Sequence, residues 1–423
     1  MNKLILTLIL FLFSIISFAQ MKCTIKGKII NRESKNILLR KCSEGYKLFM
    51  NNPTKIPIKN GQFNYTFSIK TVEAFELIFE DEFENGTWVP TLFFSTNGVI
   101  QFVLNPKDQS NKNTVIGGDL NMAYTNYQSV NKTAFEKAKS VLMGIQKDLV
   151  ETDEYESDEF KEVLKKLRAT QSGDHDAKVP IYNKMEELEK TYARYTEKAK
   201  TLFALPYDSL MNVELKWKYE YIQNNISIVG YYLIWRDVEM QMKKKQLVAQ
   251  LVAEVFPLYQ KKYPDHIYTK LIETQLAGQQ TITIGGKYID FKAPTISTGD
   301  SIQLSKVIQN QIALIDFWGS WCGPCIAKSR LVVPIYEQYK DKGFKIVGIA
   351  REFGNTAEVK NRLSKEQFTW LNLVDLDDKL NIWNKYGISN GTGLMVLVDK
   401  DGTILAIDPK PEELKKILQD KLN

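Results

Sequence analysis

The sequence predicts several domains: an antiparallel β-sandwich, a central α-helical region and a C-terminal α/β domain. Three observations support this order. The period of the apolar residues changes from two to about 3.6 near residue 121. It changes again near residue 278, where short apolar runs begin to alternate with helical patterns. The length of 423 residues also exceeds what one hydrophobic core usually serves.

Residues 1–19 are typical of a secretory signal peptide. Lys3 precedes the apolar stretch Leu4 to Phe18, and Ser17-Phe18-Ala19 provides small residues before a mature start at Gln20. An uncleaved anchor is the alternative, but the stretch is short for a span of ~20 residues. We therefore expect export to the periplasm or cell envelope, with no stable membrane span after signal cleavage.

Residues 20–120 have the character of strands. Phe63 to Phe67 alternates apolar and polar side chains, and Asn60-Gly61 and Asn97-Gly98 are hairpin signals. An antiparallel β-sandwich is the natural packing for such strands. The expected strands are Thr24 to Ile30, Ile37 to Lys41, Lys47 to Met50, Phe63 to Ile69, Ala74 to Phe79, Thr91 to Phe94 and Val99 to Leu104.

Residues 121–278 have helical periodicity. One amphipathic face runs from Phe160 to Leu167, and a second, heptad-like set runs from Ile181 to Leu202. A seam this short favours an intramolecular helical hairpin over a dimeric coiled coil, so the chain is expected to be a monomer or a dimer. His266 falls in the first turn of a helix that ends near Gly278, and we assign it no catalytic role.

Residues 279–423 alternate strand and helix. Strands are expected at Ile312 to Trp318, Lys345 to Ala350, Met395 to Asp399 and Thr403 to Ile407, and helices after Cys322, Thr356, Asp378 and Pro411. Lys400-Asp401-Gly402 indicates a hairpin turn between the last two strands.

Two thiols lie where the first of these strands turns into a helix, in Trp321-Cys322-Gly323-Pro324-Cys325. A helix N-terminus carries unpaired N–H groups and a partial positive charge, and both stabilise a thiolate at Cys322. The two sulfurs are one turn apart and can form a short disulfide. A zinc site is the alternative, but it needs four ligands and no second pair with suitable spacing follows.

The segment from Asp316 to Cys325 resembles the active site of thioredoxin. The last third of the chain, from near Ile284, resembles the TlpA/ResA-type thiol:disulfide oxidoreductases of the bacterial cell envelope. This resemblance implies a thioredoxin-like fold, with Cys322 as nucleophile, Cys325 as resolving thiol and Asp316 as the buried acid that exchanges a proton with Cys325. It also implies that Trp321, Gly323, Pro324, Thr392 and Gly393 contact the substrate. The β region resembles the N-terminal domain of unassigned function found in many multidomain members.

The chain departs from the family pattern near the cysteines. The family has a cis-proline just before the strand at Met395, where this chain has Thr392-Gly393-Leu394. We expect that proline at Gly393 would raise exchange with generic disulfides. Many ResA-like members carry glutamate three positions after the second cysteine, where Lys328 stands here.

The other two cysteines, Cys23 and Cys42, lie far upstream. They are candidates for a structural disulfide, which would contribute about 3 kcal/mol, or for unpaired core thiols. The formal net charge of +6 is modest, and nothing in the sequence predicts nucleic-acid binding.

The sequence therefore predicts an exported thiol:disulfide oxidoreductase that exchanges, and most simply reduces, disulfides in partner proteins. It needs no cofactor beyond the redox-active Cys322–Cys325 disulfide, and the resemblance suggests a membrane thiol protein as its electron donor. A scaffold protein with little turnover is the alternative. A thiol peroxidase fits less well, because that family uses a Pro and a Thr shortly before its reactive cysteine, and Trp318 to Trp321 supplies neither.

Overall fold

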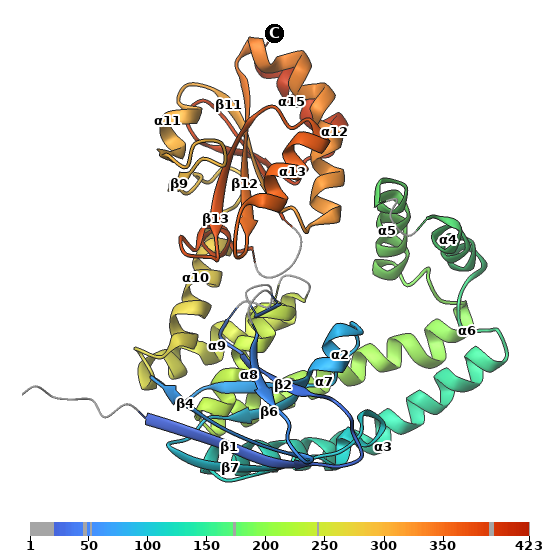
Figure 1. The fold of residues 1–423 in the computed structure, drawn as a ribbon. Coiled ribbons are helices and arrows are strands. Elements are labelled where there is room, and N and C mark those ends of the chain that lie inside the picture. The colour runs from blue at the N-terminus through green and yellow to red at the C-terminus, as the bar shows by residue number, and fades with distance from the viewer. Residues whose placement is uncertain are drawn as a thin grey trace, which may run out of the picture.

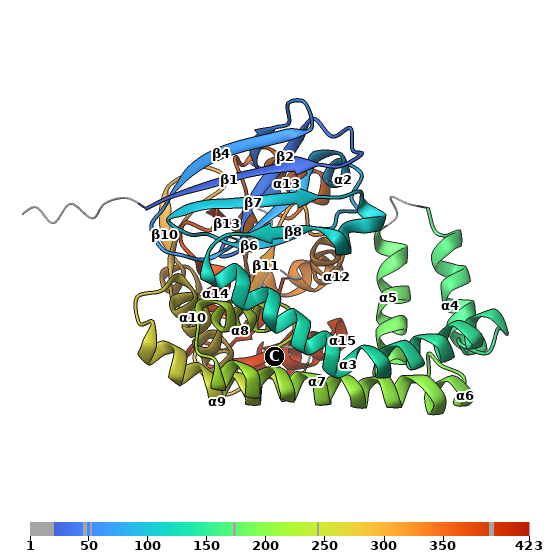
Figure 2. The same ribbon diagram turned by 90° about the horizontal axis from the view of Figure 1, so that it is seen from below.

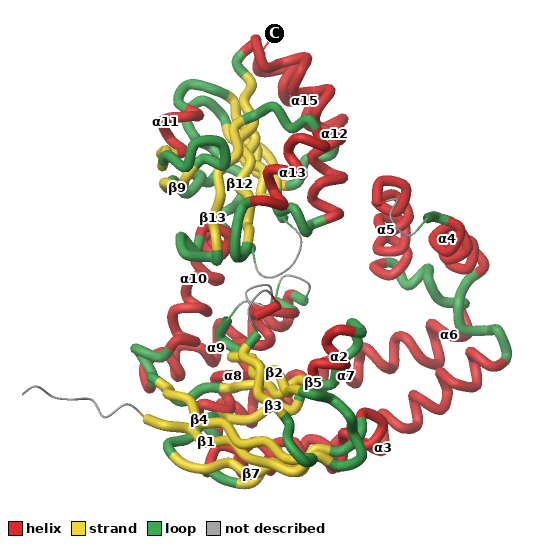
Figure 3. The backbone as a smooth tube through the Cα atoms, in the orientation of Figure 1, coloured by secondary structure: helices red, strands yellow, loops and turns green. Residues whose placement is uncertain are grey.

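The structure is a computed structural model, and it describes residues 21–44, 49–50, 53–171, 175–242, 245–388 and 393–422. A β-sandwich, a helical region and an α/β domain follow one another along the chain (Figures 1 and 3). The predicted signal peptide at residues 1–19 lies outside the described residues. Within them, no helix is both long enough and apolar enough to span a bilayer.

The N-terminal region is a sandwich of two four-stranded sheets, as predicted. Their strand orders are β4-β1-β7-β8 and β3-β2-β5-β6. All neighbouring strands are antiparallel except β1 and β7, which are parallel and depart from the expected all-antiparallel arrangement. The elements are β1 (Met21–Ile29), β2 (Asn36–Lys41), β3 (Thr54–Pro57), β4 (Gln62–Ile69), β5 (Ala74–Phe79), α2 (Glu80–Glu84), β6 (Thr91–Phe94), β7 (Gly98–Leu104), η1 (Lys107–Lys112) and β8 (Thr114–Ile116).

Two local predictions in this region need correction. Part of the strand expected at Lys47 to Met50 lies outside the described residues, and Phe49 and Met50 are helical. Asn60 and Gly61 both have positive φ, as a tight turn requires. However, this turn connects β3 to β4, which belong to different sheets. Lys59 and Gln62 exchange both backbone hydrogen bonds across the turn, at 2.8 and 3.0 Å, so the predicted hairpin turn is present and its two arms continue into different sheets. Asn97-Gly98 lies between β6 and β7, which also belong to different sheets.

The central region is helical throughout. The long helices α3 and α7 run side by side away from the sandwich and carry α4 and α5 at their far end (Figures 1 and 2). The elements are α3 (Asp119–Glu151), α4 (Asp158–Ala169), α5 (His175–Lys190), α6 (Glu197–Ala199), η2 (Lys200–Ala204), α7 (Leu205–Asn224), α8 (Ile228–Met240), α9 (Gln246–Lys262) and α10 (Ile267–Thr281).

The predicted helical hairpin is present, but its second helix is shorter than expected. Phe160 and Val163 of α4 pack against Leu188 of α5. The heptad-like set does not form one helix, because the chain turns after Lys190, where Tyr192 has a φ of 59°. A β-branched or aromatic residue adopts such a φ only where the chain leaves regular structure. The heptad-like spacing of apolar residues therefore continues across a break in the helix, which this spacing alone does not reveal.

The C-terminal domain is a five-stranded sheet with the order β13-β12-β11-β14-β15. β11, β12 and β13 are parallel, and β14 and β15 are antiparallel. The elements are β9 (Lys292–Pro294), β10 (Ser301–Gln303), α11 (Leu304–Ile308), β11 (Ile312–Trp318), α12 (Gly323–Tyr339), η3 (Lys340–Lys342), β12 (Phe344–Glu352), α13 (Ala357–Glu366), β13 (Leu371–Leu376), α14 (Ile382–Lys385), β14 (Met395–Val398), β15 (Ile404–Ile407) and α15 (Pro411–Leu422).

Each face of this sheet has its own core. α12, α13 and α15 pack on one face, and α11 and α14 pack on the other. β11 is central and buried along its whole length, as its continuous apolar run predicted. The strand β13, with the run Leu371 to Leu376, and the short strands β9 and β10 were not anticipated.

Candidate active site

The two cysteines of the motif lie where β11 ends and α12 begins. Cys322 caps α12 at its N-terminus, and Pro324 lies in the first turn, where its missing N–H costs nothing. Cys322 and Cys325 form a disulfide, with Cα atoms 5.3 Å apart. The two residues are only 3% and 4% exposed. The predicted juxtaposition of the thiols is therefore present, at a helix N-terminus that favours a thiolate.

Asp316 lies on the face of β11 that α12 covers, because it alternates with Leu314 and Trp318 of that core. The residue is 1% exposed, and burial raises the pKa of its carboxyl to about 7. Ser329 Oγ donates to Asp316 Oδ2 at 2.6 Å and also lies 3.0 Å from the carbonyl oxygen of Cys325. A single serine hydroxyl thus connects the carboxyl to the backbone of the second cysteine.

Gly393 closes the site from the far side. Its backbone N–H donates to Cys325 Sγ at 3.1 Å. A Cβ at this position would lie 1.6 Å from the carbonyl oxygen of Phe317, so no side chain fits. Proline would also lack the N–H that reaches the sulfur. The expectation that proline at Gly393 would raise exchange is therefore incompatible with the structure, and Thr392 lies outside the described residues.

The turn before Cys322 is held by a buried carboxylate. Glu352, at the end of β12, accepts hydrogen bonds from the Ser320 N–H at 2.6 Å and from Ser320 Oγ at 2.7 Å. Glu352 is 3% exposed, and burial raises the pKa of its carboxyl. Trp321 is fixed beside it, because its Nε1 donates to the carbonyl oxygen of Arg351 at 2.8 Å. These contacts fix the path of the chain into the first cysteine.

Sequence reasoning missed Ser329, Glu352 and the N–H of Gly393. Two of them had a signal. Ser329 follows Cys325 by four residues and therefore shares its helix face. Glu352 stands at the carboxyl end of a parallel strand beside β11, where polar residues of open α/β sheets converge. The contact between the Gly393 N–H and Cys325 Sγ had no sequence signal, because it depends on how closely the backbone at Gly393 approaches the sulfur.

Cys23 and Cys42 are both free and buried. Cys23 belongs to the core of the sandwich, whereas Cys42 belongs to the core that the sandwich shares with the helical region. Of the two alternatives, the structure shows unpaired core thiols, and the structural disulfide is not formed. Each thiol fills space among apolar side chains, and burial raises the pKa of both.

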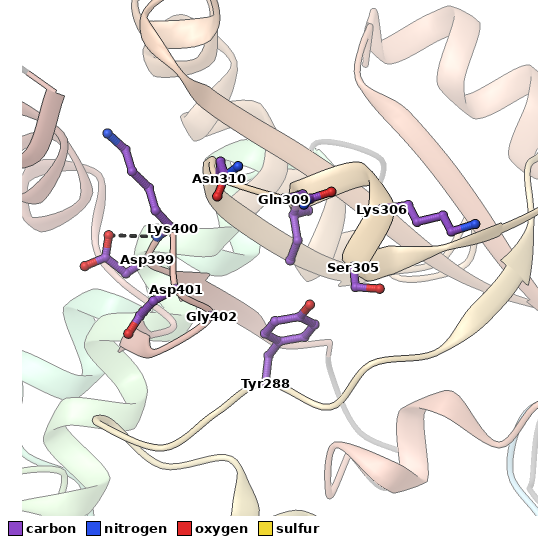
Figure 4. Close-up of a pocket in the computed structure, with 10 residues that line it drawn as sticks. Tyr288, Ser305, Lys306, Gln309, Asn310, Asp399, Lys400, Asp401 and Gly402 are labelled. Atoms are coloured by element: carbon purple, nitrogen blue, oxygen red, sulfur yellow. Dashed lines mark hydrogen bonds between the residues drawn. The ribbon is translucent and has the colours of Figure 1, made fainter.

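A separate cavity of about 370 Å³ lies at the other end of the sheet (Figure 4). Gln309 and Asn310, just before β11, and Asp401, in the β14–β15 turn, line it together with Tyr288. The cysteines follow the opposite end of β11, so this cavity is not part of the disulfide site.

Comparison with known proteins identifies the family. The Redoxin family model matches residues 284–421. A thiol-disulfide oxidoreductase ResA from Bacillus thuringiensis subsp. konkukian is 30% identical over 124 residues, which are 29% of this chain and 68% of that protein. This chain belongs to the ResA family of thiol-disulfide oxidoreductases. The family match concerns the C-terminal domain, and the Redoxin match leaves the sandwich and the helical region outside.

Other proteins are similar to this ResA-family oxidoreductase over a smaller share of their length or at lower identity. A thioredoxin-like protein from Haemophilus influenzae is 32% identical over 77 residues, which are 18% of this chain and 44% of that protein. The chain thus spans less than half the length of this relative. The crystal structure of the thioredoxin domain of a thiol-disulfide oxidoreductase from Bacteroides vulgatus is 23% identical, with a TM-score of 0.31, and covers 34% of this chain and 99% of that chain.

Proposed function

We propose that this oxidoreductase is exported and reduces disulfides of partner proteins, with Cys322 as nucleophile, Cys325 as resolving thiol and Asp316 as the acid that takes the Cys325 proton. The observation that carries the proposal is the Cys322–Cys325 disulfide at the N-terminus of α12, with the Asp316 carboxyl buried beneath it. The domain limits 20–120, 121–278 and 279–423 form part of the same proposal.

The reaction begins with both cysteines reduced. The Cys322 thiolate attacks one sulfur of a partner disulfide, and the other partner sulfur leaves as a thiolate that takes a proton from water. Cys325 then passes its proton to the Asp316 carboxylate and attacks Cys322 Sγ. The second partner sulfur leaves as a thiolate and is protonated in turn. Two electrons have moved from the cysteines to the partner, whose two sulfurs have each taken a proton from water. The Cys322–Cys325 disulfide has formed, and Asp316 returns the Cys325 proton to water.

The surroundings of the sulfurs suit this sequence of steps. A carboxyl whose pKa is about 7 can both accept and release a proton near neutral pH. The N–H of Gly393 stabilises negative charge on Cys325 Sγ. Trp321, Gly323, Pro324 and the backbone near Gly393 would contact the extended partner chain, and Thr392 belongs to this group by its position in the sequence.

Reduction in an oxidising compartment requires a supply of electrons. The signal-like sequence of residues 1–19 supports a location in the periplasm or cell envelope. A dithiol protein in the membrane is then the natural electron donor, because it can regenerate the Cys322–Cys325 pair by the same exchange chemistry. The Gly323-Pro324 dipeptide supports reduction over oxidation through its resemblance to the reducing members of the superfamily.

Trapping variants test the roles of the two cysteines. In Cys325→Ser the first attack proceeds but resolution does not, so a partner should stay disulfide-bonded to Cys322. In Cys322→Ser no such adduct should form. The adducts would be measured on non-reducing gels after incubation of the full chain with disulfide-containing insulin. Equal trapping by both variants would contradict the assignment, and trapping by neither would favour a scaffold with little turnover. Rapid peroxide consumption by the reduced protein would favour a peroxidase instead.

A further inference from the structure

An ion pair stands beside the buried acid of the active site. Lys328 Nζ lies 3.2 Å from Asp408 Oδ1, and the two side chains are 41% and 38% exposed. Lys328 belongs to α12, three residues after Cys325 and next to Ser329. Asp408 follows β15, at the edge of the sheet. The pair thus bridges the edge of the sheet to the helix that carries the cysteines.

Backbone hydrogen bonds across the strand β14 connect Asp408 to Asp316. Met395 of β14 is the antiparallel partner of Asp316 in β11. The N–H of Asp408 donates to the carbonyl oxygen of Met395 at 2.7 Å, and the N–H of Met395 donates to Asp408 Oδ1 at 3.0 Å. Residues directly opposite one another in antiparallel strands are near neighbours. Asp316, Met395 and Asp408 therefore form one row across the sheet, beneath α12.

Two opposite charges act on the Asp316 carboxyl from the ends of this pair. Burial has the largest effect and raises the pKa of this carboxyl, and the hydrogen bond from Ser329 lowers it. Lys328 then lowers the pKa, whereas Asp408 raises it in the same direction as burial. The strands that flank Asp316 add no charge at its level, because its partners there are Gly348 of β12 and Met395 of β14. From α12, Ser329 contributes a hydroxyl and Cys325 the reacting thiol. The Lys328–Asp408 pair is thus the adjustable part of the electrostatic environment of Asp316.

We propose that Lys328 and Asp408 are a positioning pair that sets the proton affinity of Asp316 and thereby the pH range in which Cys325 resolves the mixed disulfide. The inference rests on the roles proposed above for Cys322, Cys325 and Asp316. In the resolving step the Cys325 proton moves to the Asp316 carboxylate, a bond forms between Cys325 Sγ and Cys322 Sγ, and the bond from Cys322 to the partner sulfur breaks. That sulfur leaves with the electron pair, and Asp316 later returns the proton to water.

The chemistry of the pair makes the two single variants differ in sign. Lys328→Met removes the cation, so the Asp316 carboxylate is less stabilised and the resolving step should require a higher pH. Asp408→Asn removes the anion and leaves the cation uncompensated, so the same step should extend to lower pH. The asparagine side-chain oxygen can still accept from the Met395 N–H, which preserves the backbone row. A purely structural pair would impair both variants in the same direction.

The experiment uses the full chain, reduced and then mixed with excess Ellman's reagent, the aromatic disulfide of thionitrobenzoate. Attack by Cys322 releases a first thionitrobenzoate, and attack by Cys325 on the resulting mixed disulfide releases a second. The rate of each release is measured from about pH 5 to pH 9, which spans the titration of Asp316. The first release reports on Cys322 and serves as an internal control for folding and access.

We expect the pH midpoint of the second release to rise by about half a unit in Lys328→Met and to fall by a similar amount in Asp408→Asn. Lys328→Arg, which keeps the charge, should retain the wild-type midpoint. Lys421→Met is a matched control, because Lys421 also pairs with an aspartate, Asp399, but at the other end of β14. It should leave both releases unchanged.

Three results would overturn the inference. Shifts of the same sign in the two single variants would indicate a structural role, and an unmoved midpoint in both would show that the pair does not act on Asp316. A wild-type protein that gives no first release would refute the proposed role of Cys322 and the inference with it. The first two results leave the proposed function standing, so the two failures are distinguishable.

Discussion

At the scale of single residues, the site depends on a carboxyl that burial keeps near neutrality. Asp316 is enclosed by the core under α12, and the pKa of its carboxyl is raised to about 7 from 3.8. A group whose pKa is raised by folding binds its proton more tightly in the folded state. It therefore stabilises the fold at low pH, and that stabilisation is lost as the pH rises through the folded pKa. The fold retains a residue that weakens it under working conditions, which agrees with a role in proton transfer.

Asp316→Asn should make the oxidised protein more stable above pH 7 and should flatten its stability profile between about pH 4 and pH 7. The expected gain at pH 8 is on the order of a few kcal/mol, because each unit of pKa shift corresponds to about 1.4 kcal/mol. Urea unfolding at pH 5 and pH 8 measures it. Asp401→Asn is the control, since the pKa of Asp401 is about 2 and its carboxyl stays ionised at both values. A variant with no gain at pH 8 would show that Asp316 is not a buried acid.

At the scale of elements, side chains cap the N-termini of several helices. Ser157, Thr196 and Ser227 cap α4, α6 and α8 with side-chain oxygens. α10 is capped by His266 instead, whose Nδ1 accepts from the Tyr268 N–H at 3.2 Å while Nε2 donates to the carbonyl oxygen of Val72 at 3.0 Å. Both ring nitrogens are thus committed in the neutral form. The helix that leads into the α/β domain begins on a titratable cap.

Acid should weaken α10 through this cap. Burial lowers the pKa of His266, so the folded state resists protonation, and the stability it contributes is present above about pH 6.5 and lost as the pH falls below that value. His266→Asn keeps an N-cap that does not titrate. Its free energy of unfolding should therefore fall less than that of the wild type between pH 7.5 and pH 5, by about 1 kcal/mol.

Urea unfolding of the two proteins measures this difference. His175→Asn is the matched control, because His175 is the only other histidine of the chain. Equal losses in wild type and His266→Asn would show that the cap does not titrate in this range.

At the scale of the whole molecule, the cores follow the order of the chain. Both cores of the α/β domain consist of residues from Ile282 onward, whereas the sandwich and helical cores consist of earlier residues. α10 packs against α14 and against the backbone just after it, where a Cβ on Gly278 would lie 2.2 Å from the nitrogen of Gly387. Gln275 also donates to Asn384 at 2.8 Å. The α/β domain is thus self-contained but closely attached.

Residues 279–423 should therefore fold alone and keep the chemistry of the cysteines. We expect native-like circular dichroism, a cooperative unfolding transition and two thionitrobenzoates released per reduced chain, because among the described residues both cores and the contacts to the sulfurs are formed by residues of this domain. The contact at Gly278 is lost in the fragment, so its stability should be lower than that of the same domain in the full chain. A fragment without a cooperative transition would contradict the independence of its cores.

The sequence by itself determined the elements with strong local patterns. The continuous apolar run of β11 required burial on both faces, and the Cys-Gly-Pro-Cys motif required a helix start. The alternation at Phe63 to Phe67 marked β4. These signals are local, since each depends on the period of side chains along one element and not on a distant partner. The sequence did not predict the break at Tyr192 or the strand β13, because the spacing of apolar residues does not show where an element begins or ends.

Only the tertiary structure decided which groups meet at the sulfurs. Glu352, the Gly393 N–H and Asp408 come from segments that are far from the cysteines along the chain, whereas Ser329 and Lys328 belong to the same helix as Cys325. Their contacts depend on strand order, register and the distance of closest backbone approach, which no single segment specifies. The same holds for Cys23 and Cys42, whose thiols folding placed in different cores. Local pattern fixes an element, whereas the packing of elements fixes a site.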